Sequence, residues 1–286
     1  MTAFDWLQLL SAPPAPPVAR SPHGTSRRTR ADSLDSDEGE PLIADEPEPV
    51  DELQALVISD LHLGSDNCQA KPAADFLQQI LDGKIRTRQL IINGDVFDSI
   101  DFRRLKKTHW KVLSQIRHLT DKIEVIWIAG NHDGSAEIVS HLLGVRVEEE
   151  FILQSGAEKI LIIHGHQYDD FINDHPVLTW LADVAYWILQ KLDRTHYIAR
   201  LAKRRSKTFV RCSNKIRDGA RRYAASRGCS VVLCGHTHHA ESIAATPEAP
   251  AYHNSGCWTE LPSTYLTIEH GQIKTHQYTP TLISSH

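Results

Sequence analysis

Five short apolar, β-rich runs in this chain of 286 residues are each followed at once by Asp, Asn or His residues. The runs are LQALVIS (53–59), QLIIN (89–93), IEVIWIA (123–129), KILIIH (159–164) and SVVLC (230–234). Short apolar runs of this kind are typical of buried strands. Helical patterns over 73–82, 103–120, 135–143 and 176–226 separate them, and strand-like pieces follow at 251–255, 264–269 and 272–278. Strands that alternate with helices predict a layered α/β domain.

The polar residues at the strand ends form one set of candidate metal ligands. They belong to the motifs DLH (60–62), GDVFD (94–98), GNHD (130–133), HGH (164–166) and GHTHH (235–239). The carboxyl ends of the strands are the edge at which α/β sheets bind ligands. Side chains alternate along an extended backbone, so we expect Asp60 and His62 to point the same way, as well as His236 and His238. The candidate ligands are Asp60, His62, Asp95, Asn131, His164, His236 and His238.

Seven ligands are too many for one tetrahedral zinc ion. They suit two neighbouring divalent ions that share a bridging carboxylate. Mixed carboxylate and imidazole ligation favours Mn, with Fe or Zn as alternatives, over Ca or Mg. None of the five cysteines belongs to a CxxC pair, which argues against a structural zinc cluster. Each motif alone is weak or moderately specific, but their joint occurrence at successive strand ends is a strong signal.

The first part of the chain has a different composition from the rest. Prolines cluster over 13–17, and the stretch from Asp32 to Glu52 is acidic without any Lys or Arg. Such a segment cannot offset the entropy of ordering, so we predict a disordered tail over 1–53. A single domain over 54–280 follows, and it includes a helical insert at about 171–227.

The insert combines an apolar half with a basic half. Residues 177–192 are apolar around most of the helix, which fits a helix packed on two sides or a lid that holds acyl chains or touches a membrane. Residues 194–227 contain twelve Lys or Arg and one acid. This half is either a solvated helix face or a surface that binds a diphosphate, an anionic membrane or RNA. Candidate substrate contacts are Lys207, Arg211, Lys215, Tyr168 and His239.

The five motifs resemble the five blocks of the calcineurin-like metallophosphoesterases, over residues 54–278. The resemblance implies an α/β/β/α sandwich of four layers with a dimetal site at the strand ends. One ion would be held by Asp60, His62 and His238, and the other by Asn131, His164 and His236. Asp95 would bridge the two ions. The resemblance makes His132 a catalytic residue that stabilises or protonates the phosphate, Asp133 the residue that orients it, and Asp98 an outer support.

The resemblance also implies a reaction, in which a water molecule activated by the two ions attacks phosphorus. SDLHLGSDNCQA (59–70), the helical insert and NSGCWTE (254–260) are similar to the UDP-2,3-diacylglucosamine pyrophosphatases of lipid A synthesis. Those enzymes hydrolyse a nucleotide–lipid diphosphate as peripheral proteins at the inner membrane. The chain departs from that branch at His132, where the branch carries Arg, and at His166, where it commonly carries Asp.

Several alternatives remain open at this stage. The substrate could instead be a phosphoprotein or a nucleotide phosphodiester. The protein could also be a metal-free scaffold or a nuclease that binds nucleic acid. A net charge of −5 argues against nucleic acid as a partner by charge alone. The N-terminus lacks the pattern of a signal peptide. We therefore expect a cytoplasmic protein, with peripheral contact with an anionic surface of the inner membrane as an alternative.

Overall fold

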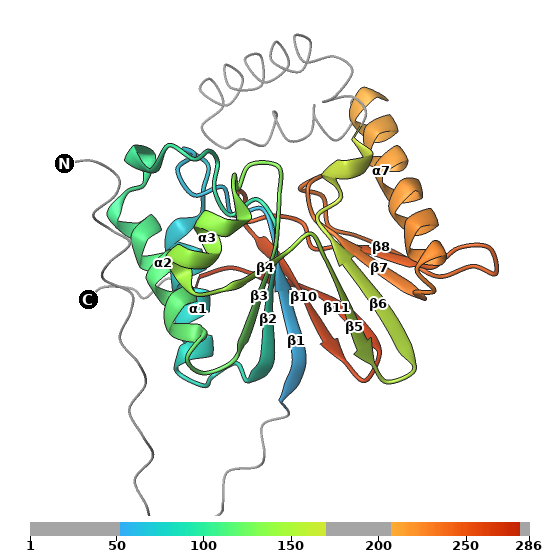
Figure 1. Ribbon diagram of the computed structural model, residues 1–286, viewed down its shortest axis with the longest axis horizontal. Helices are drawn as coiled ribbons and strands as arrows, with labels where there is room; N and C mark the ends of the chain where they lie inside the picture. The colour runs from blue at the N-terminus through green and yellow to red at the C-terminus, as the bar shows by residue number, and fades with distance from the viewer. Residues whose placement is uncertain (1–51, 170–206, 281–286) are drawn as a thin grey trace, which may run out of the picture. The chain divides into compact units, whose positions relative to one another are not determined.

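The computed structural model describes residues 52–169 and 207–280. Nearly all of the predicted tail and the first part of the predicted insert lie outside these residues. Two β-sheets organise the described part (Figure 1), with strand orders β11-β10-β1-β2-β3-β4 and β5-β6-β7-β9-β8. No helix within the two described stretches is sufficiently long and apolar to cross a membrane.

The six-stranded sheet contains the first three predicted strands and the last two. Its members are β1 (Leu53–Ile58), β2 (Thr87–Asn93), β3 (Glu124–Ile128), β4 (Arg146–Glu148), β10 (Ser263–Glu269) and β11 (Gln272–Tyr278). Strands β1, β2, β3 and β4 run parallel to one another, whereas β10 pairs with β1 in the antiparallel direction. The carboxyl ends of β1, β2 and β3 therefore meet at one edge, where the motifs DLH, GDVFD and GNHD follow them.

The five-stranded sheet contains the other two predicted strands that precede His-rich motifs. It consists of β5 (Glu150–Ser155), β6 (Glu158–Ile163), β7 (Val231–Cys234), β8 (Glu241–Ile243) and β9 (Ala251–Asn254). Strands β6 and β7 are parallel neighbours, so HGH and GHTHH also leave from one edge. The side chain of Asn93 at the end of β2 donates a hydrogen bond to the carbonyl of Ile163 at the end of β6, at 3.0 Å. This bond joins the two edges directly.

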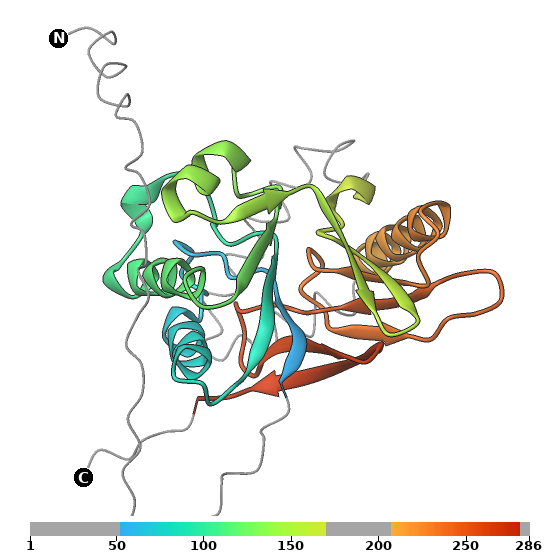
Figure 2. The same ribbon diagram turned by 60° about the horizontal axis from the view of Figure 1, so that its bottom comes forward.

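Helices cover the outer face of each sheet. These are α1 (Ala70–Leu81), α2 (Lys107–Leu119), α3 (Ala136–Leu143) and α7 (Lys207–Ser226), with short 3₁₀ turns η1 (Phe102–Arg104) and η2 (His166–Tyr168). In Figure 1 α1, α2 and α3 lie on one flank and α7 on the other, and Figure 2 shows the same arrangement from a second direction.

Three separate apolar cores fill the three spaces between these layers. In β1, Leu56 and Ile58 join the core under α1 and α2, whereas Ala55 and Val57 join the core between the sheets. In β7, Val232 joins the third core under α7. This alternation is what the period of a strand dictates when both faces of a sheet are covered. The predicted four-layer α/β/β/α sandwich is confirmed.

Three strands and one helix start differ from the sequence expectations. Strands β4 and β8 have three residues each, which is too short for a periodic signal, and acidic residues at the start of β5 hide its apolar pattern. The helix expected over 103–120 is divided into η1 and α2, with an extended residue at Leu105 between them. Of the helix expected over 176–226, the structure describes only α7.

Candidate metal centre

The backbone at the strand ends is left-handed, not extended. Asp60 and His62 have φ values of 53° and 47°, Asp95 has 53°, and His236 and His238 have 64° and 57°. Among the described residues, only His270 joins these five as a non-glycine residue with positive φ. We predicted an extended backbone whose side chains alternate, and this prediction is wrong for these residues. Left-handed turns position their side chains instead. Such conformations cost about 1–3 kcal/mol each and cluster at functional sites.

One group of donor atoms forms after β1 and β7. Single donor atoms of Asp60, His62 and His238 all lie within 4.8 Å of one another. The Nε2 atoms of His62 and His238 are 3.0 Å apart, and His238 Nε2 lies 3.3 Å from an oxygen of Asp60. The Asp60 carboxylate also accepts the backbone N–H of His236 at 3.1 Å, which holds the two turns together.

A second group forms after β2, β6 and β7, from Asp95, His164 and His236. Asp95 Oδ2 lies 3.3 Å from Nε2 of His164 and 3.6 Å from Nε2 of His62 in the first group. Asp95 therefore stands between the two groups. The Nδ1–H of His164 donates to the carbonyl of Asn93 at 2.8 Å. Its buried Nε2 has no hydrogen-bond partner among the described residues.

The spacing of these donor atoms fits divalent cations. Ligands about 2.1 Å from an ion and at right angles to each other lie roughly 3.0 Å apart. The His62–His238 distance of 3.0 Å and the His164–Asp95 distance of 3.3 Å are close to this value. Among the described residues, the nearest polar atom recorded for Nε2 of His164 is the Asp95 oxygen at 3.3 Å, and a cation between these two atoms would satisfy both. The donor set of carboxylates and imidazoles therefore suits a divalent metal.

The family of the chain follows from its match to a family model. Residues 53–240 match the model described as calcineurin-like phosphoesterase, and this range covers more than half of the chain and all five strand-end motifs in full. The chain belongs to this family. It is accordingly a metal-dependent hydrolase of phosphoesters. No curated protein matched the sequence.

Solved structures related to this calcineurin-like phosphoesterase share little sequence with it. A predicted phosphoesterase from Streptococcus pneumoniae is 17% identical, covers 80% of this chain and 99% of its own, and has a TM-score of 0.35. The E. coli phosphoesterase YfcE is 13% identical, covers 79% and 99%, and scores 0.41. Zinc-bound Vps29 from Entamoeba histolytica is 16% identical, covers 78% and 97%, and scores 0.36. These similarities carry no argument about substrate or mechanism.

The carboxylates of the two donor groups favour the charged forms of two buried imidazoles. Burial opposes the charged form of His238, but Asp60 outweighs it and raises the pKa of His238 to about 10. Burial likewise opposes protonation of His164, and Asp95 overcomes it and raises the pKa of His164 to about 9. The pKa of His62 is lowered to about 3 by burial and by the His238 charge. Metal ligands must be deprotonated, so binding of an ion would release these protons.

The motif histidine His132 is exposed at the edge of the site. Its Nδ1 is hydrogen-bonded to the backbone carbonyl of Asp98 at 2.9 Å, and its backbone N–H donates to Asp95 at 3.0 Å. The resemblance implied that Asp133 orients this ring, but the contacts of Asp133 are different. Its buried carboxylate accepts the backbone N–H groups of Asp95, Val96, Phe97 and Gly130 and the indole N–H of Trp127. Asp133 therefore holds the loop that carries Asp95, and a carbonyl holds His132.

The predicted substrate contacts are spread over α7 and the two His-rich turns. Arg211 and Lys215 are exposed on α7, and His239 is half-buried after β7. The side chain of Lys207 lies outside the described part. The ring of Tyr168 packs against the backbone of Gly219 in α7, so its contacts favour a supporting role for η2. Asn131 is exposed directly after Gly130, and the structure shows no hydrogen bond from its side chain to a described residue.

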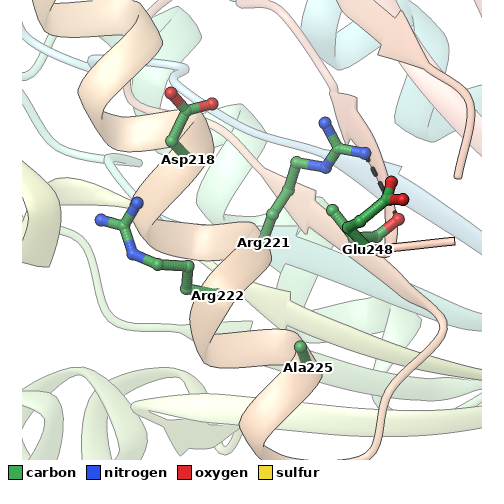
Figure 3. Close-up of a pocket in the computed structure, with 6 residues that line it drawn as sticks. Asp218, Arg221, Arg222, Ala225 and Glu248 are labelled. Carbon is green, nitrogen blue, oxygen red and sulfur yellow. Dashed lines mark hydrogen bonds between the residues drawn. The ribbon is translucent and has the colours of Figure 1, made fainter. Parts of the chain in front are cut away.

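A cavity of about 330 Å³ lies elsewhere on α7 (Figure 3). Its walls include Asp218, Arg221, Arg222 and Glu248. Arg221 donates hydrogen bonds to the carbonyls of Pro250, at 2.7 Å, and of other residues in the same loop. None of the candidate metal ligands lines this cavity, and the guanidinium of Arg221 holds the loop in place. The cavity is therefore separate from the two donor groups at the strand ends.

Sequence reasoning missed one residue of the site. Asp169 directly follows η2, and its Oδ2 lies 3.0 Å from Nε2 of His236. Both side chains are nearly buried. The motif HGH ends three residues before this position, although an Asp five residues after the candidate ligand His164 could have been tested as a partner.

Gly219→Ala is expected to displace η2 despite improving helix propensity. A Cβ at this position would lie 2.7 Å from the ring of Tyr168, so the ring and η2 must move. The substitution would gain about 1 kcal/mol in helix propensity. Overpacking costs about 1–3 kcal/mol, and we expect a net loss of stability. Urea unfolding measures the change in free energy. An unfolding free energy above wild type would contradict the packing argument.

Proposed function

We propose that the strand-end residues hold two divalent ions, with manganese as the natural metal. Asp60, His62 and His238 would hold one ion, and His164 and His236 the other, completed by Asn131 as in the family pattern. Asp95 would bridge them. The observation that carries this proposal is the position of Asp95 Oδ2, which lies 3.3 Å from the His164 nitrogen of one group and 3.6 Å from the His62 nitrogen of the other.

The chemistry divides between the ions and the side chains of the chain. Divalent ions supply positive charge against the phosphate oxygens and lower the pKa of a water molecule. His132 stands at the open side of the site, with Nδ1 held by the Asp98 carbonyl. A carbonyl oxygen can only accept a hydrogen bond, so Nδ1 must be the donor and carries a proton. This bond fixes the orientation of the ring. When Nε2 also carries a proton, it can neutralise charge on the phosphate or give that proton to the leaving oxygen.

We further propose a nucleotide–lipid diphosphate of the UDP-2,3-diacylglucosamine type as the substrate. The support is the similarity of segments 59–70 and 254–260 to that branch, together with exposed cations on α7. Lys207, Arg211, Lys215 and His239 are the proposed contacts to the diphosphate. A substrate with acyl chains would place the enzyme at an anionic membrane surface, which the basic helix would favour.

Hydrolysis assays with added Mn²⁺ test both levels of the proposal. UDP-2,3-diacylglucosamine is compared with the soluble diester bis-p-nitrophenyl phosphate. Fast release of UMP from the lipid substrate supports the lipid diphosphate. Turnover of the soluble diester alone keeps the metal-dependent hydrolase and moves the substrate to a nucleotide phosphodiester or phosphoprotein. A protein that binds Mn²⁺ but hydrolyses neither would support a scaffold.

His132→Ala should lower the rate by roughly 10²–10⁴-fold, as expected for loss of a general acid or charge-stabilising group. Metal binding should persist, because the bond from this residue to Asp95 comes from the backbone N–H. Diester turnover and metal content by mass spectrometry measure the two effects. The exposed His118 on α2 offers a matched control, and its replacement with Ala should leave both unchanged. Turnover by the His132 variant at the wild-type rate would show that this residue has no part in the mechanism.

A further inference from the structure

The nearly buried pair of Asp169 and His236 has no role in the site described so far. Asp169 Oδ2 lies 3.0 Å from Nε2 of His236, and their side chains are 12% and 8% exposed. A carboxylate so close to an imidazole nitrogen accepts a hydrogen bond from it. This contact engages Nε2 of His236, which leaves Nδ1 as the nitrogen free to serve the group with Asp95 and His164.

In the other imidazoles of the two groups, the two ring nitrogens have different partners. His164 donates from Nδ1 to the Asn93 carbonyl at 2.8 Å and turns Nε2 toward Asp95. His62 and His238 bring their Nε2 atoms together at 3.0 Å. Nδ1 of His238 lies 3.5 Å from the hydroxyl of Thr259. In each ring one nitrogen faces the donor group and the other faces its protein surroundings.

His236 reverses the assignment of its two nitrogens. Its Nε2 is engaged by Asp169, so Nδ1 is the nitrogen left for the group with Asp95 and His164. Histidines that bind metals nearly always donate the other ring N–H to a carboxylate or carbonyl, which fixes the tautomer and raises the basicity of the ligand. A carboxylate partner does this more strongly than a carbonyl because it carries a charge.

We propose that Asp169 is a positioning residue for His236. It accepts the Nε2–H hydrogen bond and selects the tautomer whose Nδ1 lone pair faces Asp95 and His164. This inference rests on the proposed function, because it assigns His236 to a metal ion. Its specific content is that Asp169 acts on one of the two ions, the one near His164, through a residue that is not itself a ligand.

The turn η2 explains how Asp169 reaches its position. The backbone N–H of Asp169 donates to the carbonyl of His166 at 3.1 Å, and that of Tyr168 donates to Gly165 at 3.2 Å. The ring of Tyr168 rests on Gly219 of α7, where a Cβ would come within 2.7 Å of it. Helix α7 therefore supports the turn, and the turn delivers the carboxylate to His236.

Calorimetric titration of the full-length, metal-free protein with Mn²⁺ tests the inference with Asp169→Ala and Asp169→Asn. The Ala variant removes the acceptor and should weaken one of the two ions by about 10–100-fold, while the affinity of the other stays unchanged. The Asn variant keeps an uncharged acceptor and should recover part of this loss. Asp121→Asn, which removes an exposed carboxylate at the far end of α2, serves as the charge control.

A second readout examines the tautomer directly. Imidazole ¹⁵N shifts of the metal-free protein should report a protonated Nε2 at His236 in wild type. The Ala variant should lose this preference. A purely structural role for Asp169 would lower the thermal unfolding temperature without changing the tautomer.

Three results would overturn the inference. Wild-type affinity for both ions in the Ala variant would remove Asp169 from the site while leaving the proposed function intact. Equal weakening of both ions in the Ala and Asn variants, with a lower unfolding temperature, would make Asp169 structural. Failure of the wild-type protein to bind Mn²⁺ at all would overturn the proposed function and this inference with it.

Discussion

Asp95→Asn should lose both metal ions and at least about 10³-fold in phosphodiester hydrolysis, which corresponds to roughly 4 kcal/mol of transition-state stabilisation. The Asp95 carboxylate lies between the two donor groups, 3.3 Å from His164 Nε2 and 3.6 Å from His62 Nε2. The substitution removes the negative charge that these positions share. Asn tolerates the left-handed backbone at this position, with φ of 53°, so the turn should survive.

Metal content by mass spectrometry and turnover of bis-p-nitrophenyl phosphate give the two measurements for this variant. The amide oxygen of Asn can still accept the backbone N–H of His132, which is 3.0 Å from Asp95 in the wild type. Asp218→Asn removes a carboxylate on α7, remote from the donor groups, and should retain both ions and full rate. An Asp95 variant with two bound ions and unchanged turnover would refute the bridging role.

Asp133→Asn should destabilise the fold by roughly 2–6 kcal/mol. The carboxylate accepts hydrogen bonds from four backbone N–H groups and from the indole of Trp127, at 2.8–3.1 Å. Oδ1 accepts two of these bonds and Oδ2 accepts three, so an amide nitrogen in either place leaves at least two buried donors without a partner. Each such donor costs about 1–3 kcal/mol. Urea unfolding gives the change in free energy.

This measurement separates two roles for Asp133. If Asp133 acted by orienting His132, the variant would lose rate while keeping its stability. If it holds the loop after β2, stability and metal content should fall together, because the same loop carries Asp95. Asp101→Asn changes an exposed carboxylate that caps η1, and its effect should stay within about 1 kcal/mol.

Much of the fold and most of the site residues could be predicted from the order of residues alone. Apolar runs bounded by Gly, Asp and His mark the strands, and parallel strands bring their carboxyl ends to one edge. These two rules predict that Asp60, Asp95 and His164 belong to one set of ligands at the strand ends. The sequence did not predict the three short or charged strands β4, β5 and β8. Their stability comes from pairing with a neighbouring strand, which leaves little periodic signal in the sequence.

The pattern of residues by itself predicted a layered α/β domain and the chemical types of the donor groups, and the resemblance to the family added the number of layers. Only the tertiary structure decided how those groups meet. Left-handed turns position the side chains of Asp60 and His236, whereas the sequence predicted an extended backbone with alternating side chains. The partners of Asp133 and the pairing of Asp169 with His236 also join residues far apart in the chain. Local periodicity reports which face of an element is buried, whereas the hydrogen-bond partner of a buried carboxylate depends on which segments the packed layers bring beside it.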